Sequence, residues 1–263
     1  MKDALEEIRR RIGKKINSIV TKELVIGVSY TGVRISSDDV GLANTPLSEF
    51  SYESCNIFSS AGTLTNPTTH ELAKLAQSWD LSERVVGVAA VNALSQLAIR
   101  TNGADIVTKS GDAIDLAKIE KEDTVVMIGN MRPSVQKLRE RAKKVLVLER
   151  SVGLRDKDTF PDTAAETVIP RGDIVFLTGA TLCNGTTDRI LELSRGAREV
   201  VMLGASAGVF PPTLFERGVT SVGSLAIQDP GKVMKSISEG GGGFAVLKSA
   251  RYVVHMPKIK KKK

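Results

Sequence analysis

The chain has 263 residues, of which 41% are hydrophobic and 4% aromatic, and its formal net charge at pH 7 is +7. This length allows two domains and a sizeable aliphatic core without disulfide bonds. Five of the 37 basic residues lie in the tail 258–263, which leaves 32 against 30 acidic residues in the body. A nearly neutral body argues against a nucleic-acid-binding face, except through the lysine tail.

The sequence carries no secretion signal and no apolar run that approaches the length of a membrane span. Its two cysteines, Cys55 and Cys183, form no C-x-x-C motif. We therefore expect a cytoplasmic protein that makes no membrane contact. The sequence leaves open whether the chain forms a homo-oligomer.

The first hundred residues combine helical and strand patterns, which predicts a small α+β domain over residues 1–102. In chain order we expect a helix over 4–20, strands within 23–36 and over 40–43, and helices over about 70–79 and 82–100. Asn92 interrupts the apolar face of the last helix. A buried asparagine needs hydrogen-bond partners, so it either binds neighbouring backbone or points into a pocket.

The polar stretch 103–111 is expected to be a linker, and strands then alternate with helices over 112–257. We expect strands over 124–128, 145–148, 166–169, 174–177, 200–203 and 219–222, with helices near 134–143 and 230–238. This alternation predicts a parallel sheet covered by helices, a Rossmann-like domain. With Rossmann order, the strand order reverses between 125–128 and 174–177, and ligands bind at that point.

Two loops at the predicted carboxyl edge of this sheet are rich in glycine and in hydroxyl side chains. Residues 178–187 follow one strand, and Gly204–Gly208 follow the next. Backbone amides and short hydroxyl groups of this kind hold polar or anionic groups. We therefore predict a ligand site at this edge.

A dinucleotide site is the first specific alternative. Glu149 lies twenty residues after Gly129, where nucleotide-binding sheets place the acid that binds a ribose. The turn reads Gly129-Asn-Met-Arg-Pro133, however, and the side chains of Met131 and Arg132 would obstruct the pyrophosphate. The pattern argues against NAD.

Hydrolase and metal sites are the other two alternatives. Gly204–Gly208 matches G-x-S-x-G, and Asp229 and His255 follow in triad order, but two prolines come before the next helix. The histidines and cysteines show no zinc-ligand spacing. Two kinds of metal site stay open: one built from carboxylate and carbonyl ligands, and one for a metal that arrives already chelated.

Several segments together resemble the putative heavy-metal chelation family, whose members join an enolase-N-terminal-like domain to a Rossmann-like domain. The segments that carry the resemblance are Gly27–Val33, Val88–Leu94, Thr124–Pro133, Val147–Arg150 and Thr178–Thr186. The resemblance implies a site between the two domains that involves Tyr30, Asn92, Glu149, Thr178, Asn184 and Thr186. Where the family usually has Gly-Pro-Ser and a further proline, this chain has Gly204–Gly208, so we expect a more flexible loop there.

We therefore expect a protein that binds or processes a metal chelate, or an anionic small molecule that coordinates metal, in an inter-domain cleft. The predicted ligand-binding residues are Tyr30, Asn92, Gly129, Asn130, Arg132, Glu149, Thr178, Thr181, Asn184, Thr186 and Ser206. The alternative is an enzyme that acts on a nucleotide-like or pterin-like molecule without tightly bound metal. The sequence leaves the catalytic residues, the metal ligands and the cofactor open; a metal ion is the candidate cofactor, and NAD is not expected.

Overall fold

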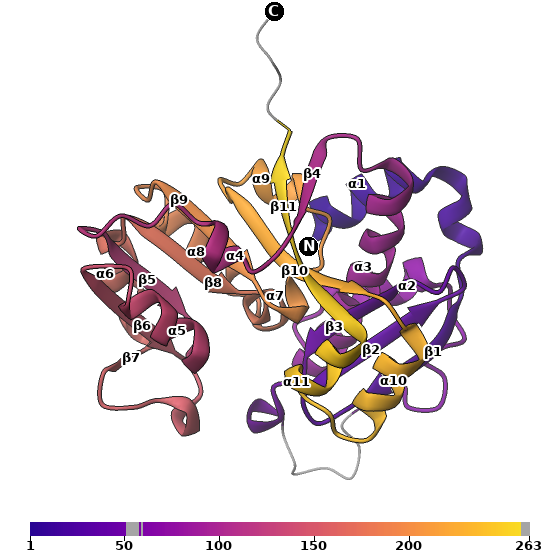
Figure 1. The fold of residues 1–263 in the computed structure, drawn as a ribbon. Coiled ribbons are helices and arrows are strands. Elements are labelled where there is room, and N and C mark those ends of the chain that lie inside the picture. The colour runs from indigo at the N-terminus through magenta and orange to yellow at the C-terminus, as the bar shows by residue number, and fades with distance from the viewer. Residues whose placement is uncertain (51–57, 59, 259–263) are drawn as a thin grey trace, which may run out of the picture.

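The computed structural model describes residues 1–50, 58 and 60–258, which form an α/β protein with two sheets (Figure 1). One sheet is antiparallel and has the order β1-β2-β3; the other has eight strands in the order β4-β11-β10-β9-β8-β5-β6-β7. This mixed architecture confirms the predicted α/β class.

The small sheet and the first three helices come from the N-terminal hundred residues. Their bounds are α1 (Lys2–Ile12), β1 (Thr21–Ile26), β2 (Tyr30–Ile35), β3 (Val40–Asn44), α2 (Thr69–Lys74) and α3 (Leu81–Asn102). The helix expected over 4–20 ends at Ile12, because Gly13 adopts φ +71° and a 3₁₀ turn follows. Asp80 caps α3, because its carboxylate accepts the amide of Glu83.

Eight strands and eight helices form the rest of the described chain. The strands are β4 (Ile106–Ser110), β5 (Thr124–Ile128), β6 (Lys144–Glu149), β7 (Thr159–Pro161), β8 (Ile174–Thr178), β9 (Glu199–Leu203), β10 (Ser221–Ile227) and β11 (Ala250–Pro257). The helices are α4 (Ala113–Leu116), α5 (Arg132–Arg139), α6 (Ala165–Val168), α7 (Ala180–Asn184), α8 (Thr187–Leu193), α9 (Pro212–Phe215), α10 (Pro230–Ser238) and α11 (Gly243–Val246).

The six parallel strands β5 to β10, numbered along the chain, lie in the order 3-2-1-4-5-6. Doubly wound nucleotide-binding sheets have this order, and it reverses between β5 and β8. The sequence places the reversal at the same two strands. β11 and β4 extend the sheet antiparallel beyond β10.

Two further local predictions need correction. Residues 166–169, expected as a strand, lie mostly in α6, and the outer strand is β7 instead. The expected linker 103–111 contains β4, which pairs with β11 at the edge of the sheet. Its side chains are mostly exposed, and so its polar composition concealed a strand.

Helix α3 joins the two sheets through one apolar core. Val88 and Ala89 of α3 belong to the same buried cluster as Leu182, Phe210 and, on the large sheet, Val175. In Figure 1 the small sheet lies beside α3, and α10 packs near β1 and β2. Within residues 1–50, 58 and 60–258, no helix has both the length and the apolar content needed to cross a bilayer.

Candidate functional site

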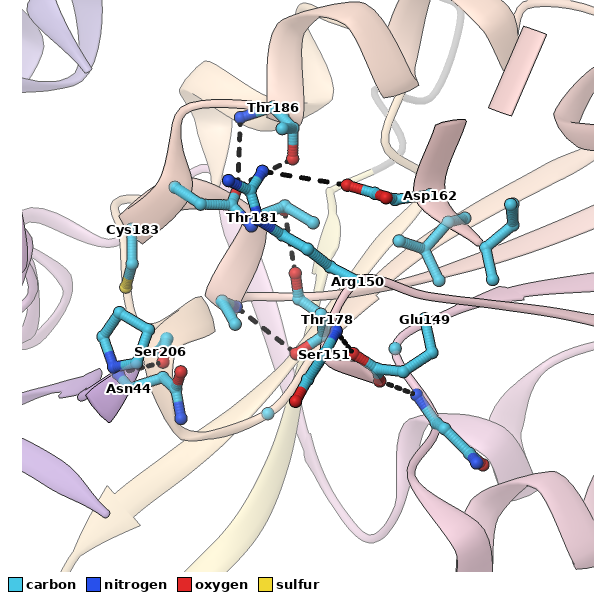
Figure 2. A pocket seen from close by; sticks show the side chains of 18 of the residues that line it. Asn44, Glu149, Arg150, Ser151, Asp162, Thr178, Thr181, Cys183, Thr186 and Ser206 are labelled. Atoms are coloured by element: carbon cyan, nitrogen blue, oxygen red, sulfur yellow. Dashed lines mark hydrogen bonds and ion pairs between the residues drawn. The ribbon is translucent and has the colours of Figure 1, made fainter. Parts of the chain in front are cut away.

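A cavity of about 850 Å³ lies at the carboxyl ends of β5, β6, β8 and β9. The loops that follow these four strands form one wall. Tyr30 and residues 44–49, which follow β3, form the opposite wall. Figure 2 shows side chains from both walls pointing into this space.

Most of the predicted ligand-binding residues line this one cavity. They are Tyr30, Gly129, Asn130, Glu149, Thr178, Thr181, Asn184, Thr186 and Ser206. Asn92 and Arg132 are not among its lining residues. The carboxyl ends of parallel strands meet at one edge of a sheet, which is why residues so far apart in the sequence converge.

Asn92 joins backbone segments rather than lining the cavity. Its side chain is buried, and Nδ2 donates to the carbonyls of Leu42, at 2.8 Å, and Ser206, at 2.9 Å. Its Oδ1 has no hydrogen-bond partner in the described chain. Of the two predicted roles, the structure shows the first: Asn92 ties β3 to the loop after β9.

Arg132 is exposed at the first position of α5. Helix α5 begins there, and the side chain faces solvent outside the cavity. The prediction rested on its position in the loop after β5. Of that turn, Gly129, Asn130 and Met131 do line the cavity.

Glu149 lies at the end of β6 and is nearly buried. Its Oε2 accepts the amide of Asn130 at 2.7 Å, and its Oε1 accepts the amide of Ser151 at 2.7 Å (Figure 2). The carboxylate therefore holds the loops after β5 and β6 together. Each oxygen retains a lone pair for a further donor.

The hydroxyl groups after β8 shape a tight turn beside the cavity. Thr181 Oγ1 donates to the Thr178 carbonyl at 2.8 Å, and Thr186 Oγ1 donates to Asn184 Oδ1 at 2.7 Å. Gly185 allows the turn because it adopts φ +76°. Thr187 Oγ1 donates in turn to Thr181 Oγ1 at 2.9 Å.

Ser206 lies where the two walls of the cavity meet. Its Oγ accepts the backbone amide of Asn44 at 2.8 Å. Cys183 also lines this part of the cavity (Figure 2). Burial raises the pKa of the Cys183 thiol to about 12, although the neighbouring Ser206 hydroxyl and Asn44 amide lower it. Cys183 is therefore a neutral thiol at physiological pH.

The sequence did not identify the charged residues that face each other in the cavity. Arg150, after β6, forms an ion pair with Glu49 at 2.8 Å and lies 3.8 Å from Asp162. Glu49 lies in the 3₁₀ turn Leu47–Glu49. In the sequence it falls in the long stretch between the strand predicted over 40–43 and the helix predicted over about 70–79, and a stretch of that length is a signal of function. Arg150 follows Glu149 directly, but adjacency does not show which way a side chain points.

Tyr30, at the start of β2, contributes a phenol to the cavity wall opposite the sheet. Burial raises the pKa of this phenol. Tyr30 is therefore a neutral hydroxyl that can both donate and accept a hydrogen bond.

The G-x-S-x-G match does not form a hydrolase triad. His255 Nδ1 is 2.9 Å from Thr108 Oγ1, and His255 Nε2 is 3.2 Å from Ser224 Oγ. Asp229 caps α10 by accepting the amide of Lys232. Neither residue lines the cavity with Ser206.

The described residues of the cavity do not provide a ligand set for a bare heavy-metal ion. Soft ions prefer thiolate and imidazole ligands, but the described residues that line the cavity include one cysteine, Cys183, and no histidine. Across residues 1–50, 58 and 60–258, no three His, Cys, Asp or Glu side chains gather closely enough to bind a metal. A metal bound to an organic chelator needs fewer protein ligands, because the chelator supplies them.

Two family models match the chain, and both are described as putative heavy-metal chelation. One matches residues 112–256, more than half of the chain, and the other matches residues 9–95. An uncharacterized protein of Methanocaldococcus jannaschii is 29% identical over 244 residues, which cover 88% of this chain and 89% of that protein.

Two solved structures of unknown function, both from the DUF364 family, are similar over nearly the whole chain. The Pyrococcus horikoshii protein is 26% identical, with a TM-score of 0.81 over 95% of this chain and 98% of that one. The Desulfitobacterium hafniense protein is 22% identical, with a TM-score of 0.77 over 98% and 100%, a likeness of fold. The chain belongs to the putative heavy-metal chelation family and has the two-sheet α/β fold of these solved structures.

Proposed function

We propose that the cavity binds an anionic small molecule that coordinates metal, or the metal chelate of such a molecule. The observation that carries this proposal is the convergence of hydroxyl, amide and carboxylate groups from both sheets on one 850 Å³ cavity. Cavities of this size hold drug-sized molecules, and a few convergent polar groups orient them. The family description supports the link to metal.

The ligand supplies most of the metal's coordination sphere in this proposal. Thr178, Thr186 and Asn184 offer hydroxyl and carboxamide groups, which suit the oxygen atoms of an organic chelator. Glu149 keeps free lone pairs for a hydroxyl group of the ligand or for its metal. In this proposal the small-sheet unit is enolase-N-terminal-like, the large sheet is Rossmann-like, and the ligand lies between them.

Native mass spectrometry of protein purified without a histidine tag or chelators tests the proposal. We expect a mass excess over the denatured protein that matches a metal–organic species. Ala165→Trp should remove it, because Ala165 lines the cavity and an indole there fills space the ligand needs. Ala61→Trp adds the same ring at an exposed position and should keep it. An excess that survives Ala165→Trp would place the ligand elsewhere.

A second candidate is an enzyme that acts on a nucleotide-like or pterin-like molecule without tightly bound metal. The position of the cavity favours it, because the strand order reverses between β5 and β8 and such crevices bind nucleotides. Glu149, at the end of β6, has the position of a ribose-binding acid. A thermal-shift panel of nucleotides and pterins at millimolar concentration tests it; the absence of any shift counts against it.

A further inference from the structure

Among the described residues, five charged side chains line the cavity, and they differ in how fully they are paired. Arg189 forms ion pairs with Glu166 at 2.6 Å and with Glu192 at 2.8 Å. Two backbone amides hold Glu149. Arg189 and Glu149 are therefore already engaged by strong partners within the protein.

Of the two arginines among the described lining residues, Arg150 has the greater unused donor capacity. Its Nε pairs with Glu49 at 2.8 Å, and its Nη1 lies 3.8 Å from Asp162, beyond hydrogen-bond distance. A guanidinium group carries five N–H donors arranged to match a carboxylate or a phosphate. In Figure 2 the Arg150 side chain extends across the cavity toward Asp162.

The apolar part of the same cavity lies along the loops and helices that follow β6, β7 and β8. Leu154, Ala165, Ile169, Ile190 and Leu193 line it. Apolar walls of this kind bind a carbon skeleton rather than a hydrated inorganic ion. A ligand that fills the cavity would therefore have both an apolar body and a charged group.

We propose that Arg150 is the specificity-determining residue of the cavity and that it selects organic anions with an apolar body and a carboxylate, phosphate or sulfonate group. The inference rests on the proposed function and names its ligand class. Glu49 occupies Arg150 in the free protein and competes with the ligand's anionic group. Because Glu49 follows β3 and Arg150 follows β6, binding releases an ion pair that joins the two walls of the cavity.

Two fluorescent probes separate the charge from the apolar body. 8-Anilinonaphthalene-1-sulfonate carries an aromatic body and a sulfonate, and N-phenyl-1-naphthylamine has the same rings without the charge. Arg150→Gln should weaken sulfonate-probe binding at least about ten-fold, the usual effect of a hydrogen-bonded charge, and leave the neutral probe unchanged. Glu49→Gln should strengthen sulfonate-probe binding about three-fold, since it removes a partly exposed competitor.

Arg189→Gln is the matched control, because Arg189 also lines the cavity but is paired with two carboxylates. It should change neither affinity by more than about two-fold. One result would overturn the inference but leave the cavity as the binding site. In that result, Ala165→Trp abolishes the binding of both probes, while the wild type and Arg150→Gln bind the sulfonate probe equally well. Undiminished binding of both probes to Ala165→Trp would contradict the inference and the proposed function together.

Discussion

The close contact between β3 and α3 leads to a strong prediction about stability. A Cβ atom on Gly41 would lie 2.1 Å from the carbonyl oxygen of Ala89 and 2.2 Å from the amide nitrogen of Ala93, both in the backbone of α3. Ordinary contacts begin at 3.4 Å, so Gly41→Ala must separate β3 from α3 by about 1.3 Å, the difference between 3.4 and 2.1 Å. Neither backbone can rotate away as a flexible side chain would.

We expect Gly41→Ala to lower the free energy of unfolding by about 3 kcal/mol, the upper end of typical overpacking costs. Alanine also restricts the unfolded chain more than glycine does, which by itself would raise the free energy of unfolding by less than about 1 kcal/mol. The expected net loss includes this opposing effect. Such a loss decreases the folded-to-unfolded ratio about a hundred-fold. The separation should also lengthen the bond from Asn92 to the Leu42 carbonyl, which holds the cavity wall in place.

Urea unfolding followed by far-ultraviolet circular dichroism measures this loss. Tryptophan fluorescence suits it poorly, because the single tryptophan, Trp79, is 96% exposed in the folded protein. Gly196→Ala is the control, since a Cβ there meets no atom within 4 Å, and its effect should stay within about 0.5 kcal/mol. A loss below about 1 kcal/mol for Gly41→Ala, relative to this control, would refute the steric argument.

The remaining predictions concern three buried polar side chains. Asn92→Ala should cost about 2–4 kcal/mol in urea unfolding, because two buried carbonyl groups lose their donor; a cost under about 1 kcal/mol would contradict the bridging role. Burial lowers the pKa of His255 to about 4, below its unfolded value of about 6.5, so its contribution is complete above pH 6.5 and is lost as pH falls toward 4. Wild type should therefore lose about 2 kcal/mol more stability than His255→Gln between pH 7 and pH 5, and equal losses would show that His255 is not the group responsible. Burial raises the pKa of Cys183 to about 12. In a Cys55→Ser variant, Cys183 should therefore resist a thiol-specific disulfide reagent at pH 8 until urea unfolds the chain. If the folded protein reacts at the rate of a free thiol, Cys183 is not buried as the structure shows.

The sequence predicted a parallel sheet because apolar strand runs are local signals, whereas the position of the reversal followed from an assumed Rossmann-like strand order. Five of the six parallel strands, all except β7, appear as short β-branched or apolar runs, and their alternation with helices predicts a parallel sheet. β4 was missed because an exposed edge strand buries few side chains. Residues 166–169 appeared strand-like because Val168 and Ile169 are apolar, yet these side chains reach the core from a helical turn.

The site was predictable only where it follows from the sheet. Residues at the ends of strands, such as Glu149 and Thr178, or in the loop after a strand, such as Ser206, lie at the carboxyl edge by topology alone, and each lines the cavity. Residues that act through tertiary contacts give no such signal, because Arg150 meets Glu49 only after α3 has packed the small sheet against the large one. Asn92 shows the converse: its polarity within an apolar helix signalled a special role, but only the packed structure shows that it binds backbone on both sides. The loops of the sheet thus supply the polar groups of the cavity, whereas the contact between the two units determines which of its charges a ligand can reach.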